Sequence, residues 1–464
     1  MRPATMVITS TGEYGGAMTS SEPAAEPDAG LRDFVAQRTA QYSQAARLVR
    51  DEAAAAGTLV WDPYDPAWVK DPYRVYAQLR QSNPVHRNAL GFWVFTRHAD
   101  CLAILRDRRS SSDGRNIEET TFRELRASDF PVEQGPAAML AEMAPFLFRD
   151  PPDHTRLRGL VQKAFTPRVV EGLRPRLQEI CDGLLDEALE RGEVDLVADY
   201  AYPIPVQIIV EMLGVPAEDH EQFRVWSHAL ARGLDPDFLL PPEAVQRRLG
   251  AILSFVQYFA ALIEERRQKP GDDLLTRLIQ AEEQGDVLTQ AELLSTCILL
   301  LVAGHETTVN LISGGALTLI EHPEQMARVR DDPAIIRSAV EEMVRFVCPV
   351  QLTGRVALED MEVGGARISK GEFSMLLIGS ANRDPGAFED PETFDVGRTD
   401  NNHLGFGFGI HHCLGAPLAR LEAVVALPTL LRRARQLERI TDDLAYKENI
   451  VLRGLESLPV RLSA

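Results

Sequence analysis

The feature that most constrains the fold of this chain is a glycine-rich segment near its carboxyl end, residues 406–415, with the sequence FGFGIHHCLG. Its glycines permit backbone conformations with positive φ, which let a chain fold tightly around one atom. Residues 414–422 then show the pattern of a helix start, so that Cys413 would lie among loop amides at the positive end of a helix dipole. Such a setting is expected to lower the pKa of the thiol and to stabilise a thiolate as a metal ligand. The alternative is a buried structural thiol, because most free cysteines are of that kind.

Composition and charge argue against several classes of protein. Of 464 residues, 68 are acidic and 49 are basic, and the formal net charge of −19 argues against binding to nucleic acid. The cysteines are odd in number and widely spaced without a C-x-x-C pair, which argues against a disulfide framework or a zinc module. No secretory signal or membrane anchor is recognisable, so we expect a cytoplasmic protein. The five cysteines are Cys101, Cys181, Cys297, Cys348 and Cys413.

The chain divides into three parts by pattern. Residues 1–30 are polar, lack apolar periodicity and are expected to be disordered. Residues 31–60 are expected to form a helical extension, with an amphipathic helix that ends near Gly57. Residues 61–464 contain no recognisable repeat or linker, and we expect them to form one domain.

Within that domain the pattern is mostly helical. Runs typical of strands occur in two places only, at residues 84–97 and 353–380, where turn residues separate short β-rich stretches. Residues 108–145 and 233–242 are rich in turn-forming residues and are candidate lids over a pocket. The sequence therefore predicts a mainly α protein with a small β-rich part.

The segment from Phe406 to Gly415 resembles the haem-binding loop of the cytochrome P-450 superfamily, F-G-x-G-x-H-x-C-x-G. The resemblance covers about residues 61–464 and points to the soluble bacterial type. It implies a mainly α cytochrome P-450 fold, one helix-rich domain with a small β-rich part. It also implies that Phe406 and Gly407 belong to the cofactor-binding loop and that Cys413 is the thiolate ligand of the iron in haem b. A thiolate ligand favours O–O cleavage, so the expected activity is that of a haem-thiolate monooxygenase.

A long helix is expected N-terminal to this loop. Thr289 and Glu292 have the spacing of a capping box, and Pro323 follows an apparent helix end near Glu321. A helix of about 32 residues would span about 48 Å, enough to cross a domain. The apolar run at residues 293–304 is too short to cross a bilayer, and we expect it to be buried.

The resemblance places an acid–threonine pair above the iron on this helix, within the sequence AGHETT at residues 303–308. Gly304 would leave room for dioxygen. Thr307 would hydrogen-bond the distal oxygen and pass protons, and Glu306 would supply them. The alternative is an ordinary buried helix in which the threonine hydroxyl bonds a carbonyl one turn back.

Two further sets of residues match the family's order. Glu342 and Arg345 are spaced i, i+3 on one helix face, and the resemblance implies a buried structural pair with Arg398 as a candidate third member. His154 and Arg158 are spaced i, i+4 and share a face. The resemblance implies that this second pair holds the haem propionates together with two more residues. Those two residues are Arg355 and His411. Taken singly, His154 would be an ordinary surface histidine and Arg355 a solvated strand residue.

Electrons are expected to come from another protein. The chain after Cys413 is too short for a flavin domain, and neither a dinucleotide-binding glycine fingerprint nor iron–sulfur cysteine spacing occurs. The resemblance implies a ferredoxin and an NAD(P)H-dependent ferredoxin reductase. A group of basic residues is a candidate docking patch for an acidic carrier, and a solvated helix face is the alternative. The group consists of Arg156, Arg158, Lys163, Arg168, Arg174 and Arg176, together with Arg420.

The candidate substrate pocket is apolar with one amide, which suits a lipophilic molecule such as a terpenoid, steroid, macrolide or fatty acid. The expected reaction inserts one atom of O2 by hydroxylation or epoxidation. Two alternatives remain: a peroxide-driven or isomerising haem-thiolate enzyme, and a haem-based binding or sensing protein without turnover. The expected lining consists of Leu300, Ala303, Gly304, Thr307, Val350, Gln351 and Leu352, with the loop at residues 108–145.

Overall fold

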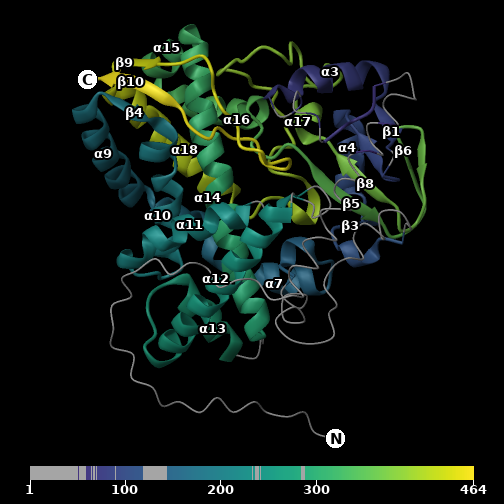
Figure 1. Ribbon diagram of the computed structural model, residues 1–464, viewed down its shortest axis with the longest axis horizontal. Coiled ribbons are helices and arrows are strands. Elements are labelled where there is room, and N and C mark those ends of the chain that lie inside the picture. The colour runs from purple at the N-terminus through teal and green to yellow at the C-terminus, as the bar shows by residue number, and fades with distance from the viewer. Residues whose placement is uncertain are drawn as a thin grey trace, which may run out of the picture.

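The computed structural model describes residues 47 and 51, residues 59–118 apart from 64, 66, 67, 69 and 89, residues 144–231, 234, 235 and 240, and residues 242–283 and 288–464. Helices dominate this part of the chain, as predicted, and small sheets lie at two sides of the helical body (Figure 1). The helices are α3 (Pro72–Ser82), α4 (His98–Arg106), α7 (Asp153–Gln162), α8 (Pro167–Gly172), α9 (Arg174–Arg191), α10 (Pro203–Met212), α11 (His220–Ala231), α12 (Pro242–Gln268), α13 (Leu274–Glu283), α14 (Gln290–Glu321), α15 (Pro323–Asp331), α16 (Ile336–Phe346), α17 (Ile378–Ala381) and α18 (Ala416–Arg433).

The expectations for residues 1–60 fall almost wholly outside the described residues. Arg47 and Asp51 are helical, and the disorder expected for residues 1–30 stays a prediction. Of the two candidate lids, only residues 108–118, 144 and 145 of the first and residues 234, 235, 240 and 242 of the second are described. Their role as lids also stays a prediction.

Helix α14 has the bounds that its local signals predict. The Thr289 hydroxyl accepts a hydrogen bond from the Glu292 amide at 3.2 Å, and the Glu292 carboxylate accepts one from the Thr289 amide at 2.8 Å. The helix runs for 32 residues and ends before Pro323. By length and composition it could cross a membrane, but 72% of its most apolar window is buried inside the molecule. The expected burial of the apolar run is thus confirmed, and α14 is a core helix.

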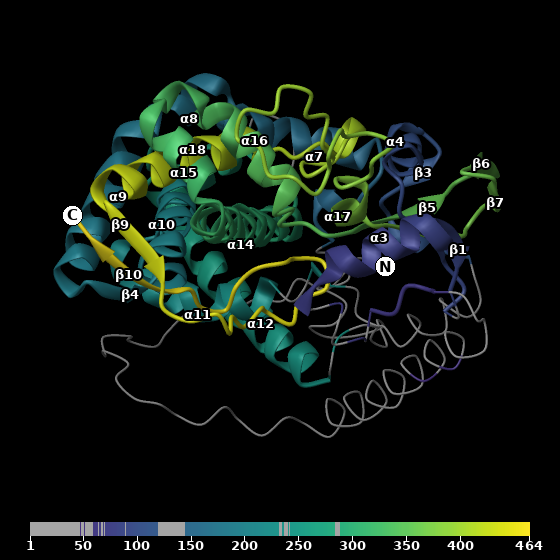
Figure 2. The same ribbon diagram turned by 90° about the horizontal axis from the view of Figure 1, so that it is seen from above.

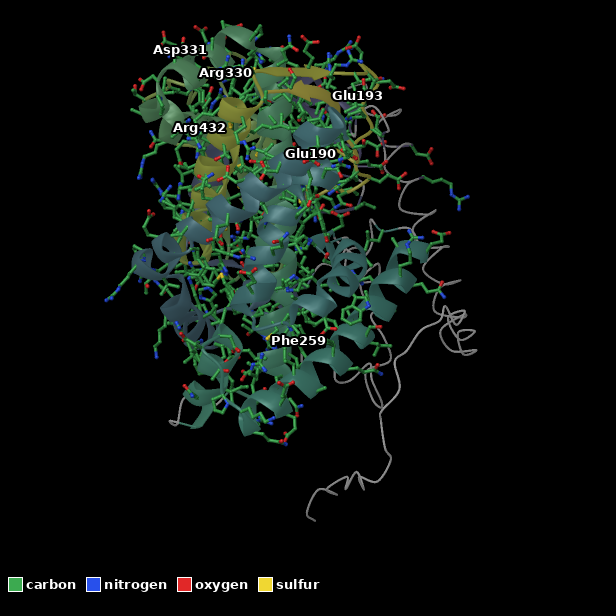
Figure 3. All side chains as sticks on the ribbon, turned by 90° about the vertical axis from the view of Figure 1, so that its left-hand side faces the viewer. Glu190, Glu193, Phe259, Arg330, Asp331 and Arg432 are labelled. Carbon is green, nitrogen blue, oxygen red and sulfur yellow. The ribbon has the colours of Figure 1, made fainter. Side chains whose placement is uncertain are left out.

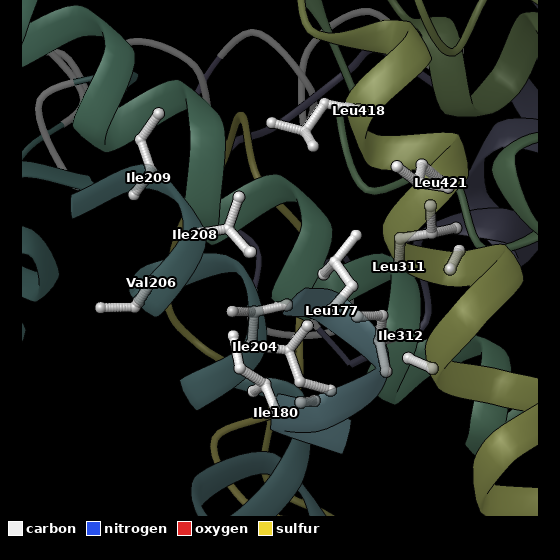
Figure 4. Packing of buried hydrophobic residues seen from close by; sticks show 14 of the residues in the cluster. Leu177, Ile180, Ile204, Val206, Ile208, Ile209, Leu311, Ile312, Leu418 and Leu421 are labelled. Atoms are coloured by element: carbon white, nitrogen blue, oxygen red, sulfur yellow. The ribbon is translucent and has the colours of Figure 1, made fainter. Parts of the chain in front are cut away.

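The main core forms around α14, which passes through the middle of the molecule in Figure 2. Helices α10, α11 and α12 contact it, and so do α15, α16 and α18. Figure 4 shows branched apolar side chains of α9, α10, α14 and α18 that belong to this core. They include Leu177, Ile204, Ile312 and Leu421. This packing holds two helices of the candidate site in place: α14, which contains residues 303–308, and α18, which follows Cys413.

Four strands of a five-stranded sheet come from the two segments that the sequence predicts as strands, and the fifth, β3 (Ser110–Ser111), lies outside both segments. The order of the sheet is β1 (Val85–Arg87), β2 (Trp93–Phe95), β8 (Phe373–Leu376), β5 (Thr353–Ala357) and β3. Strands β2 and β8 are parallel, with Trp93 opposite Ser374, and the other pairs are antiparallel. A second apolar core with Trp61, Trp68 and Tyr76 packs on this sheet.

The expectation that strands occur in two places only is wrong. Strands β4 (Glu193–Asp195), β9 (Gln436–Arg439) and β10 (Pro459–Ser463) form a separate sheet of order β4-β10-β9. These strands have only three, four and five residues, so even the alternation of Val460 and Leu462 with Arg461 in β10 is too short to distinguish them from other segments. The hairpin of β6 (Met361–Val363) and β7 (Ala366–Ile368) was expected, because its two-residue turn is Gly364-Gly365 with φ of 62° and 85°.

The surface carries the charge of the chain. Figure 3 labels Glu190, Glu193, Asp331 and Arg432, all exposed, at the outside of the helical body and Phe259, which is fully buried, within it. Most charged residues follow this pattern. A charged side chain that is fully buried is therefore an exception, and the candidate site contains several.

Candidate functional site

The cysteine loop folds tightly around Cys413. The amide of Cys413 donates a hydrogen bond to the carbonyl of Phe406 at 2.8 Å, and the amide of Gly407 donates to Leu404 at 2.8 Å. Gly407 and Gly409 have φ of 68° and 73°, the left-handed region that favours glycine. A Cβ at position 409 would also lie 2.7 Å from the Leu105 carbonyl oxygen. The glycines therefore let the loop lie against α4 and close over the sulfur.

The electrostatic setting of Cys413 differs from the one expected. Burial raises the pKa of the Cys413 thiol, while hydrogen bonds from the amides of Gly415 and Ala416 and the charge of Arg158 act in the opposite direction. The predicted lowering of the pKa is wrong, because desolvation outweighs the amides and the charge. A coordinated metal cation would reverse this balance, since it deprotonates a coordinating thiol.

Four residues that carry or can carry positive charge meet beside this loop. Helix α7 supplies His154 and Arg158, β5 supplies Arg355 and the loop supplies His411. The rings of His154 and His411 have centroids 4.3 Å apart, and Arg158 Nη2 donates to the His412 carbonyl at 2.6 Å. Arg355 is 9% exposed and donates to the carbonyl of Gly354 at 2.7 Å. The structure thus brings together the four residues from three separate segments.

Ring nitrogens of the two histidines in this cationic cluster have no hydrogen-bond partner within the described part of the chain. Burial, followed by the charges of Arg355, His154 and Arg158, lowers the pKa of His411 to about 3. Burial lowers the pKa of Arg355 to about 10. Both ring nitrogens of His154 and Nε2 of His411 are buried and have no hydrogen-bond partner among the described residues. Buried polar atoms are rarely left unpaired, so the cluster fits a bound group with carboxylates.

The Glu342–Arg345 pair is fully buried and holds the chain before the cysteine loop. Arg345 donates to both carboxylate oxygens of Glu342 at 2.8 Å and to the carbonyls of Asn382 at 2.9 Å and Pro391 at 2.8 Å. Arg398 donates to Glu342 at 3.1 Å. Three segments are therefore joined through one carboxylate, in the arrangement expected from the sequence.

The acid–threonine turn of α14 contains one arrangement that the sequence does not indicate. The Thr307 hydroxyl donates to the Ala303 carbonyl at 2.8 Å, which leaves its lone pairs able to accept a hydrogen bond. Glu306 is 1% exposed and forms an ion pair with Lys447, which lies 141 residues further along the chain. His305 Nε2 lies 3.7 Å from the other oxygen of Glu306.

The interpretation of Gly304 changes. A Cβ at this position would lie 3.2 Å from Cδ1 and Cγ1 of Ile209 on α10. The missing side chain therefore permits close packing of α10 against α14, and it does not open space for a ligand in that direction. Sequence alone does not show this, because the neighbour belongs to a distant segment.

The structure also separates the expected pocket residues. Ala303, Thr307 and Val350 are partly exposed, while Leu300 and Leu352 are buried in the two apolar cores. Gln351 is 1% exposed, and its amide is used up: Nε2 donates to Cys348 at 2.7 Å, and Oε1 accepts from Tyr76 at 3.0 Å. Gln351 therefore joins segments through its amide, and its place in a substrate pocket stays a prediction.

Glu422 on α18 is a buried acid to which the sequence interpretation gave no role. It is 1% exposed, and neither carboxylate oxygen has a hydrogen-bond partner among the described residues. Burial raises its pKa to about 8, against a smaller opposite effect of Thr308. A signal was present, because a single acid follows Leu421 and precedes the apolar run at residues 423–428.

The comparisons with known proteins agree with this site. A family model described as Cytochrome P450 matches residues 138–443 of the chain. The chain belongs to the cytochrome P450 family. The expected family and fold are thereby confirmed. Members of this family carry haem with a cysteine thiolate ligand, and this P450 is an oxidoreductase of the monooxygenase type.

Bacterial relatives cover nearly the whole chain. This P450 is 40% identical over 416 residues to the polyketide biosynthesis cytochrome P450 PksS of Bacillus subtilis (strain 168), which covers 87% of this chain and 99% of the relative. It is 40% identical over 413 residues to 6-deoxyerythronolide B hydroxylase of Saccharopolyspora erythraea, with the same two coverages of 87% and 99%. The solved structure of P450BioI with a hexadec-9Z-enoic acid ligated acyl carrier protein has a TM-score of 0.76 and 38% identity, and the match covers 85% of this chain and 99% of that one.

Proposed function

We propose that this P450 inserts one atom of O2 into a lipophilic small molecule by hydroxylation or epoxidation, with haem b as its cofactor and electrons from a separate ferredoxin and NAD(P)H-dependent ferredoxin reductase in the cytoplasm. The observation that carries the proposal is the placement of Cys413, in a loop closed by glycines, beside a buried cationic cluster with unpaired ring nitrogens. A cysteine thiolate is one of the axial ligands that haem iron accepts, and basic side chains are suitable partners for the two carboxylates of haem b.

The residues of the chain fit this group. Cys413 would be the axial ligand, within the loop that Phe406 and Gly407 shape, and His154, Arg158, Arg355 and His411 would bind the propionates. When bound, the haem would supply the redox chemistry that activates O2. Glu342 and Arg345 would hold the segment before the loop in place. We assign Glu306 as the proton source and Thr307 as the group that accepts a hydrogen bond and orders water in the pocket.

Replacing Thr307 by alanine tests the proton-delivery assignment. We expect Thr307→Ala to retain haem and ligand binding but to divert reducing equivalents to hydrogen peroxide, because the ordered proton donor is lost. Thr318→Ala is the matched control, since Thr318 makes the same bond to a carbonyl one turn back, to Gly314 at 2.8 Å, away from the site. The measurement is hydrogen peroxide released per NADPH consumed, and equal coupling in the two variants would contradict the assignment.

The candidate docking patch is smaller than the sequence suggests. Four of its seven members form ion pairs with carboxylates: Arg156, Arg174, Arg176 and Arg420. Lys163 and Arg168 are exposed beside α7 and remain the candidate contacts for an acidic carrier. Paired charges contribute little to a net field, so these two residues carry the proposal.

Reversing both charges tests the patch. We expect Lys163→Glu with Arg168→Glu to slow reduction by ferredoxin about tenfold at low ionic strength and to leave haem content unchanged. The control reverses Lys269 and Arg461, two exposed basic residues outside the patch. Stopped-flow reduction is the readout, and an unchanged rate would show that the carrier docks elsewhere.

The substrate is proposed to be lipophilic because the partly exposed lining, Ala303, Thr307 and Val350, is mostly apolar. The name of one relative refers to polyketide biosynthesis, that of another to 6-deoxyerythronolide B, and one solved relative is in complex with an acyl carrier protein ligated with hexadec-9Z-enoic acid. The test is substrate-dependent NADPH consumption with a surrogate ferredoxin and reductase across lipophilic compounds, including macrolactones and myristic acid. Oxygenated product supports the proposal. Spectral binding without product across the panel would favour a binding or sensing protein, and product from peroxide alone would favour a peroxide-driven enzyme.

A further inference from the structure

A hairpin near the carboxyl end of the chain lies against the acid–threonine turn of α14. Residues 446–455, here called the C-terminal hairpin, are closed by an antiparallel bridge between Tyr446 and Leu455 and by a hydrogen bond from the Lys447 amide to the Gly454 carbonyl at 2.9 Å. A second bridge joins Leu452 to Val350. The hairpin therefore connects α14 with the segment that follows α16.

The hairpin contacts α14 at two positions on one helix face. The Lys447 ammonium forms an ion pair with Glu306, and the two side chains are 10% and 1% exposed. One turn further along, a Cβ at position 454 would lie 1.8 Å from the Asn310 amide oxygen, so only glycine allows this approach. Because Glu306 and Asn310 are spaced i, i+4, both contacts fix the hairpin on the same face of the helix.

The tip of the hairpin is held independently of Lys447. The Asp235 carboxylate, 3% exposed, accepts hydrogen bonds from the amides of Ile450 at 3.0 Å and Val451 at 2.8 Å. The Val451 carbonyl accepts a hydrogen bond from the Gln351 amide at 2.8 Å. The backbone that carries Lys447 is thus anchored by Asp235 and by Gln351, and the Lys447 side chain pairs with the Glu306 carboxylate.

We infer that Lys447 is a positioning residue for Glu306, holding its carboxylate in the orientation from which it serves Thr307. This inference rests on the proton-supplying role proposed for Glu306. A carboxylate buried to this extent is costly to leave without a counter-charge. The Lys447 ammonium pairs directly with Oε1, and Nε2 of His305 lies 3.7 Å from Oε2. Removing the ammonium would take away a direct partner that fixes the direction of the Glu306 carboxylate.

The experiment uses the haem-loaded protein with surrogate ferredoxin and reductase, and myristic acid as the probe. We expect Lys447→Met to lower the product formed per NADPH at least about fivefold and to raise hydrogen peroxide correspondingly. Probe affinity should stay within about twofold, and Lys447→Arg, which keeps the charge, should restore coupling within about twofold. The control Lys370→Met removes an exposed ammonium and should change nothing.

A double variant shows whether Lys447 acts through Glu306. In a Glu306→Gln background, adding Lys447→Met should produce no further loss of coupling, because the carboxylate that Lys447 holds is already absent. Because both side chains are uncharged in this double variant, it can also be compared with Glu306→Gln if Lys447→Met alone fails to fold. Additive losses would overturn the inference. If Glu306→Gln uncouples the enzyme and Lys447→Met does not, the inference fails and the role of Glu306 stands; if Glu306→Gln has no effect, both fail.

Amide hydrogen exchange separates positioning from scaffolding without any turnover. Since Asp235, Gln351 and Val350 hold the hairpin, its amides should exchange in Lys447→Met at the wild-type rate. Faster exchange along residues 446–455 would mean that Lys447 merely holds the hairpin and would overturn the inference.

Discussion

Replacing Glu342 by alanine is expected to lower the free energy of unfolding by about 3–5 kcal/mol, because removing one partner of a buried charge pair leaves the other uncompensated. Glu342 and Arg345 are both 0% exposed, and Arg398 also donates to Glu342. The segment that Arg345 binds leads into the cysteine loop, so we also expect the variant to lose haem. Equilibrium denaturation and haem content are the two measurements.

The control for Glu342 is an acid without such a network. Glu362 on β6 is exposed, and Glu362→Ala should change stability by no more than about 0.5 kcal/mol. A Glu342→Ala protein with wild-type stability would show that the buried pair does not hold the segment.

The second large effect is a dependence of stability on pH that Glu422 imposes. Burial raises its pKa from 4.5 to about 8. Between these values the unfolded chain has released the proton and the folded chain retains it, so stability falls as pH rises through this window and the loss is complete above about pH 8. The shift corresponds to about 4–5 kcal/mol, since one pKa unit is about 1.4 kcal/mol. A glutamine at this position does not ionise in this pH range, so it causes no loss of stability as the pH rises.

We therefore expect Glu422→Gln to gain stability relative to the natural protein by about 4–5 kcal/mol when the pH is raised from about 4.5 to about 9. Urea unfolding across that range measures the difference. Glu456→Gln, at an exposed glutamate, should show no such trend. A difference between Glu422→Gln and the natural protein that does not vary with pH would mean that Glu422 titrates normally in the folded state.

Helix ends and tight turns could be predicted, because residues next to one another in the sequence determine them. The capping box at Thr289 and Pro323 gave both ends of α14, and Gly364-Gly365 gave the β6–β7 turn. Strands β4, β9 and β10 were not predicted, because they are only three to five residues long and the pairing of β4 with β10 joins residues 193–195 to residues 459–461. Short strands with partly exposed faces are therefore the least predictable part of this fold.

The candidate site follows the same rule. The sequence brought out Cys413, and the family resemblance associated it with His154, Arg355 and His411, which the structure places together. The close neighbours of Gly304 and Gln351 could not be predicted, since the atoms they contact come from α10 and α3. Lys447 could not be found, because its partner lies 141 residues away and no motif links them. Residue types are readable from sequence, whereas contacts between distant segments are not.

The measurement that tests the central claim most directly is the absorption spectrum of the purified protein, reduced with dithionite and exposed to carbon monoxide. If the Cys413 thiolate is the haem ligand, the Soret band lies at the long wavelength that marks a thiolate opposite carbon monoxide, and Cys413→Ala loses that band. A short-wavelength Soret band in the natural protein, or the absence of bound haem, would contradict the account.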